Sequence, residues 1–132
     1  MPRGDRRSLV LWSWVVLALL AAHDVTHVVD DGLDTSPGQL AVVAIPQWLA
    51  LAGLMTVVIR DDGGHGRTAA LLLGISVVVG FAIVHLLPVT PISFWELQPS
   101  LVSWVLAWAA TAAGVWLAVL ARPPLRASVQ YS

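Results

Sequence analysis

Four long apolar stretches alternate with short polar segments along the chain. They cover residues 8–29, 39–59, 68–87 and 101–121. At about 1.5 Å of rise per residue, a helix of each length reaches across roughly 30 Å of hydrocarbon. The segments between them are rich in glycine, proline and aspartate, and short connections make successive helices antiparallel neighbours. The pattern predicts an all-α, integral membrane four-helix bundle with up-down-up-down order, which forms a single domain over residues 1–132.

The composition strengthens this prediction and limits the chemistry. The chain is 58% hydrophobic and only 11% charged, a balance far from that of ordinary soluble domains. It has no cysteine, which excludes disulfides and thiolate metal ligands. A bound metal would therefore need nitrogen and oxygen ligands.

The charged residues are sorted by the end of the predicted bundle on which they fall. Lysine is absent, and the seven arginines lie before the first stretch, between the second and third, or after the fourth: Arg3, Arg6, Arg7, Arg60, Arg67, Arg122 and Arg126. By the positive-inside rule, this end and both termini are cytoplasmic in the cell membrane. The other end carries acids without a cation: Asp24, Asp30, Asp31, Asp34 and Glu96. We therefore expect an acidic outer face.

The first stretch could also be interpreted as a secretory signal peptide, because a basic start precedes an apolar run and small residues. Its removal would leave three spans and would break the regular placement of the arginines. We therefore expect the first stretch to be retained as a helix of the bundle.

A group of polar residues stands at the end of this first stretch. At about 100° per residue, His23, His27, Asp30 and Asp31 fall within an arc of roughly 100°, with Asp24 at its edge. Such a polar face is costly in lipid. We expect it to turn toward the bundle interior or toward a water-filled pocket.

Other polar residues reach the same depth from the remaining segments. His85 stands near the end of the third stretch, and Gln47 follows Pro46 in the second. A proline within a helix frees a backbone carbonyl that needs another partner. Ser103 begins the fourth stretch, and Glu96 lies in the outer connection. We predict an outward-facing pocket lined by Gln47, Glu96 and Ser103.

The two histidines of the first stretch have the spacing with which one helix can chelate a divalent ion. We expect His85 as the third ligand and Asp30 as the fourth, with Asp24 and Asp31 as alternatives for the fourth position. A set of nitrogen and carboxylate ligands suits Zn(II) best, and Fe(II), Ni(II), Co(II) and Cu(II) are chemically allowed.

A coordination position left open on such a metal would support hydrolysis. Asp24 or Asp31 could then act as the general base, or could orient a ligating imidazole. Because the site is expected at the depth of the outer headgroups, the substrate class would be a lipid or another amphiphile with an ester or amide bond.

Three alternatives to metal binding remain open. In the first, the histidines only bind water, headgroups or backbone carbonyls of a non-catalytic bundle. In the second, the acidic end is the mouth of a small dimeric, proton-coupled or cation transporter. In the third, His27 and His85 hold a haem. Small residues along the helices favour close packing within the bundle or in a homodimer, and the few dispersed arginines argue against a nucleic-acid partner.

Overall fold

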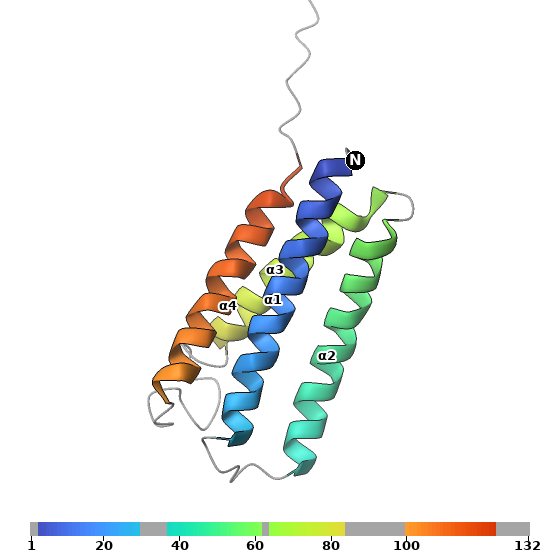
Figure 1. Ribbon diagram of the computed structural model, residues 1–132. Helices are drawn as coiled ribbons and strands as arrows, with labels where there is room; N and C mark the ends of the chain where they lie inside the picture. The colour runs from blue at the N-terminus through green and yellow to red at the C-terminus, as the bar shows by residue number, and fades with distance from the viewer. Residues whose placement is uncertain (1–2, 30–36, 62–63, 84–99, 124–132) are drawn as a thin grey trace, which may run out of the picture.

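The computed structural model describes residues 3–29, 37–61, 64–83 and 100–123. It consists of four helices, with no strand in these ranges (Figure 1): α1 (Arg3–Val29), α2 (Pro37–Arg60), α3 (Gly66–Phe81) and α4 (Leu101–Leu120). The prediction of an all-α chain with four helices is confirmed. Helix α1 begins at Arg3, five residues before the expected apolar stretch, because the polar residues before Ser8 continue the helix. The part of the third stretch beyond residue 83 lies outside the described residues.

The helices run antiparallel in chain order. The start of α1, the end of α2 and the end of α4 lie at the same end of the bundle (Figure 1). Two hydrogen bonds join the first two of these ends, because the Arg6 guanidinium donates to the backbone carbonyls of Ile59 and Arg60. The up-down-up-down order predicted from the short connections is therefore present in the described helices.

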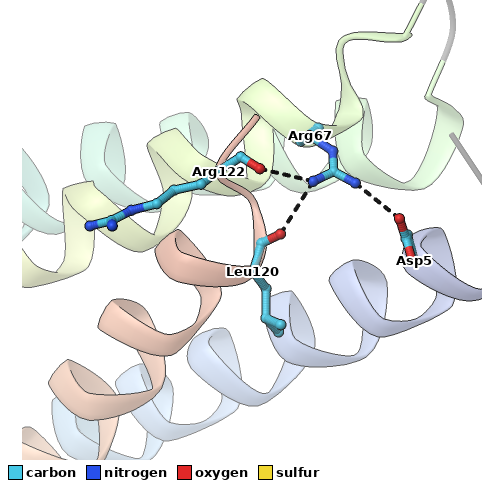
Figure 2. Close-up of polar contacts among 4 residues, drawn as sticks. All are labelled: Asp5, Arg67, Leu120 and Arg122. Atoms are coloured by element: carbon cyan, nitrogen blue, oxygen red, sulfur yellow. Dashed lines mark hydrogen bonds and ion pairs between the residues drawn. The ribbon is translucent and has the colours of Figure 1, made fainter. Parts of the chain in front are cut away.

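A second arginine joins the remaining ends of the bundle. Arg67, in the first turn of α3, donates from Nη1 to the carbonyl oxygens of Leu120 at 3.4 Å and Arg122 at 3.0 Å (Figure 2). Its Nη2 forms an ion pair with Asp5 of α1 at 3.1 Å. The carbonyls at the end of a helix carry partial negative charge. Arg67 therefore caps α4 while it contacts α1.

Small residues line the closest helix contact in the bundle. A methyl group built on Gly74 of α3 would lie 2.5 Å from the carbonyl oxygen of Gly114, and one built on Gly114 would lie 3.0 Å from that of Gly74. The neighbouring Ala70, Ala110 and Ala113 are buried as well. Gly53 and Gly80 differ, because nothing lies within 4 Å of a methyl group built there. Of the glycines expected to support packing, Gly74 and Gly114 do so inside the bundle.

Large apolar side chains, in contrast, cover much of the outside. Helix α4 exposes seven large apolar side chains: Leu101, Val102, Val105, Trp108, Val115, Trp116 and Val119. Its buried residues are mostly serine, alanine and glycine. Two helical stretches of the described chain, Asp5–His27 and Leu101–Leu120, are long and apolar enough to cross a membrane. The other two apolar stretches, Ala44–Arg60 and Gly66–Phe81, are shorter. Length and composition thus support two of the four expected spans, and the crossing by all four stays a prediction.

Candidate functional site

The two histidines of α1 face each other at the end of the bundle opposite the arginines. Their Nε2 atoms lie 3.1 Å apart, and their ring centroids lie 4.6 Å apart with the planes nearly perpendicular at 81°. The spacing of four residues places the two side chains one turn apart on the same face of the helix. His23 is buried and His27 is half-buried. The two rings are therefore joined by a hydrogen bond between their Nε2 atoms at the edge of the bundle interior.

The second ring nitrogen of His23 is directed toward α4. Ser103 Oγ lies 3.4 Å from Nδ1 of His23, and both residues are buried. The start of α4 positions this serine, because the Ser100 side chain accepts a hydrogen bond from the Ser103 amide at 3.2 Å and caps the helix. Ser103 therefore contacts the buried imidazole, and its hydroxyl can select the tautomer of His23.

The polar residues next to the histidines are directed elsewhere. Asp24 points toward α2, where its Oδ2 accepts a hydrogen bond from Nε1 of Trp48 at 3.0 Å. The Thr26 hydroxyl donates to the His23 carbonyl within α1 at 2.7 Å. Consecutive residues on a helix are about 100° apart, so His23 faces α4 while Asp24 faces α2. The end of α1 therefore makes separate polar contacts with two neighbouring helices.

The remaining predicted site residues fall into two groups. Gln47 is exposed, and its side chain makes no hydrogen bond with any described residue. Asp30, Asp31, His85 and Glu96 lie outside the described residues, and so does any contact they make with the histidines. Within residues 3–29, 37–61, 64–83 and 100–123, no three histidine or acidic side chains form a group that could hold a metal ion.

Trp48 is the site residue that the sequence analysis missed. It follows Gln47 directly and lies at the depth of Asp24, and its indole N–H is a donor that needs a partner when it is removed from water. A tryptophan in an apolar helix at the depth of an acid on the neighbouring helix was the available signal.

The described site thus contains two imidazoles in contact, one hydroxyl on the buried imidazole, and a carboxylate held by an indole on the adjacent helix. Imidazole nitrogens bind divalent metals and exchange protons. In comparisons with known proteins, no family model, no curated protein and no solved structure matches the chain.

Proposed function

We propose that the chain is a four-helix integral membrane protein that binds a divalent metal ion, with zinc favoured, at the end that carries His23 and His27. The proposed membrane location is supported by the distribution of side-chain size, because large apolar residues lie on the outside of the bundle and small residues lie inside it. Large apolar residues such as Val105 and Trp108 are exposed, while Ala107 and Ala110 face the other helices. Lipid solvates large apolar side chains, and small residues let membrane helices approach closely.

The orientation in the membrane follows from the arginines. Arg6, Arg7, Arg60, Arg67 and Arg122 lie at the end that contains the start of α1 and the end of α4. By the positive-inside rule, we place this end and both termini in the cytoplasm. The histidines then lie at the outer boundary of the cell membrane. Gly53 and Gly80, exposed on α2 and α3, provide small surfaces at which a second copy of the chain could approach in a homodimer.

One observation carries the metal-binding proposal: the 3.1 Å separation between Nε2 of His23 and Nε2 of His27. Zinc–nitrogen bonds are about 2.0–2.1 Å long, so a tetrahedral ion holds two ligand nitrogens about 3.3 Å apart. The pair is already close to this separation. Binding of one ion would release the proton that the two nitrogens share and would turn both lone pairs toward the metal.

Ser103 supports the same assignment for the buried ring. A hydroxyl oxygen that accepts the proton of Nδ1 leaves the lone pair of His23 on Nε2, the atom that faces His27. Metal-binding histidines usually have such a partner on the other ring nitrogen, which fixes both tautomer and orientation. We propose His85 and Asp30 as the further ligands, as the sequence analysis expected.

Metal analysis of the purified chain tests this proposal. We expect about one zinc per chain in detergent after dialysis against trace metal, and none in the His23→Ala, His27→Ala double variant. His65→Ala is the matched control, because His65 is an exposed histidine at the opposite end. Equal traces in all three proteins would overturn the proposal, since a pair that only shares a hydrogen bond retains no ion.

Activity assays on the zinc-loaded protein distinguish a hydrolase from a transporter. Zinc-dependent cleavage of an ester or amide amphiphile, lost in the Asp24→Asn variant, is the outcome expected for a lipid hydrolase. Proton flux into reconstituted vesicles driven by a cation gradient is the outcome expected for a transporter. Absence of a Soret band excludes the haem alternative.

A further inference from the structure

A cleft separates the start of α1 from the end of α2, at the opposite end from the histidines. Its volume is about 550 Å³, and its lining residues are Arg6, Arg7, Val10, Leu11, Trp14 and Ile59. The cleft is shallow and largely open, so a ligand bound there would lie along the surface of the bundle. The lining combines two cations with a continuous apolar wall, which is the combination expected for an amphiphilic ligand.

The cationic part of the cleft keeps unused hydrogen-bond donors. Arg6 bridges the cleft, and both of its bonds to α2, to the carbonyls of Ile59 and Arg60, use Nη2. A guanidinium has five N–H donors, so Nε and Nη1 remain available. Arg7 is exposed and makes no hydrogen bond or ion pair with the described residues. The neighbouring acid, Asp5, forms its ion pair with Arg67 and none with Arg6 or Arg7.

The apolar part continues from the arginines along α1. Arg7, Leu11 and Trp14 follow the i, i+4, i+7 spacing of one helix face, which extends about 10 Å along the axis. Leu11 is 62% exposed, Trp14 is 54% exposed and Ile59 is 42% exposed. These side chains form a wall beside the arginines rather than part of the core.

We infer that this cleft binds one anionic phospholipid of the cytoplasmic leaflet, with its phosphate between Arg6 and Arg7 and an acyl chain along Val10, Leu11 and Trp14. The inference rests on the membrane placement proposed above and is independent of the metal site. Two guanidiniums that form no ion pair with the described residues select a headgroup with net negative charge over a zwitterionic one, since arginine binds phosphate with charge-assisted hydrogen bonds. The apolar wall selects a lipid over free phosphate.

Native mass spectrometry of the full chain in detergent tests the inference, with phosphatidylglycerol and phosphatidylcholine of identical chains as probes. We expect one phosphatidylglycerol to be retained in preference to phosphatidylcholine. The Arg7→Gln variant should lose this affinity by about fivefold, the share of one arginine near a membrane surface. Arg122→Gln, which removes an exposed arginine at the same end but outside the cleft, should retain it. Arg7 is preferred to Arg6 for this test, because Arg6 also caps α2.

Three outcomes would overturn the inference. Equal retention of the two lipids would show that the cleft does not select charge. Equal losses in Arg7→Gln and Arg122→Gln would show diffuse attraction to the whole basic end. Binding of inorganic phosphate as tight as that of the lipid, unchanged by Trp14→Ala, would assign the cleft to a soluble anion. Zinc content should be the same in all these variants, so a failure here is distinguishable from a failure of the metal site.

Discussion

The indole nitrogen of Trp48 donates to Oδ2 of Asp24 at 3.0 Å and joins α2 to α1 near the histidine pair. In the Trp48→Phe variant, an aromatic ring remains but the donor is lost. We expect the free energy of unfolding to fall by about 1–2 kcal/mol, the range for a hydrogen bond to a carboxylate. Unfolding by a denaturing detergent, followed by circular dichroism, gives this value.

Trp108→Phe is the matched control for that variant. Trp108 is half-exposed on α4, and its ring lies 5.2 Å from that of Phe81, a contact that phenylalanine can retain. If the two residues act as a pair, the double variant, Asp24→Asn with Trp48→Phe, should lose less stability than the sum of the two single losses. Additive losses would mean that Asp24 and Trp48 stabilise the bundle independently.

The contact between Ser103 and His23 predicts a separate effect on metal affinity. In Ser103→Ala, Nδ1 of His23 loses the hydroxyl at 3.4 Å, so the tautomer and the ring orientation are less well fixed. Loss of such a supporting partner typically weakens metal binding by about 10- to 100-fold. Zinc titration in competition with a chelator measures the change.

Ser13→Ala separates this effect from the general loss of a buried hydroxyl. Ser13 is fully buried on α1, and its hydroxyl has no hydrogen-bond partner among the described residues. We expect unchanged zinc affinity and a stability that is unchanged or higher, because an unsatisfied polar group is removed. A matching loss of affinity in both serine variants would contradict the role assigned to Ser103.

The fold could be predicted from the sequence because its signal is long and repeated. Each helix is marked by a long, mainly apolar run that ends near turn-forming residues, and the stretch 101–121 agrees with α4 (Leu101–Leu120) to within one residue. The start of α1 differs from the expected residue 8, since Arg6 and Arg7 are good helix formers and extend the helix into the polar segment. Composition alone does not distinguish that extension from a polar tail.

The candidate site could be predicted only where helical spacing fixes a contact. His23 and His27 share one helix, and their spacing alone brings them together. The contacts of Asp24 with Trp48, and of His23 with Ser103, depend on how the helices are rotated about their axes. Close contacts such as the one between Gly74 and Gly114 set that rotation. The sequence does not reveal these contacts, because large apolar residues occur on every side of each helix.

The crossing of α3 and α4 predicts opposite results for two glycines. Gly74→Ala places a methyl group 2.5 Å from the Gly114 carbonyl, so the helices must separate. We expect a loss of about 1–3 kcal/mol in the free energy of unfolding, as for other overpacked contacts. Gly53→Ala meets nothing within 4 Å and should be neutral, or stabilising by up to about 1 kcal/mol through helix propensity. Similar effects of the two variants would contradict the close crossing.

Arg67 predicts how the basic end of the bundle is held together. Arg67→Gln removes two hydrogen bonds to the end of α4 and the ion pair with Asp5, and we expect a loss of about 1–2 kcal/mol. Asp5→Asn should cost less than about 1 kcal/mol, because the Asp5 side chain is 53% exposed and water screens the ion pair. Arg60→Gln is the control for loss of charge, since the exposed Arg60 side chain makes no hydrogen bond with the described residues. If Arg60→Gln destabilises the bundle as much as Arg67→Gln in thermal unfolding, then the net charge of this end, and not the capping of α4, determines its stability.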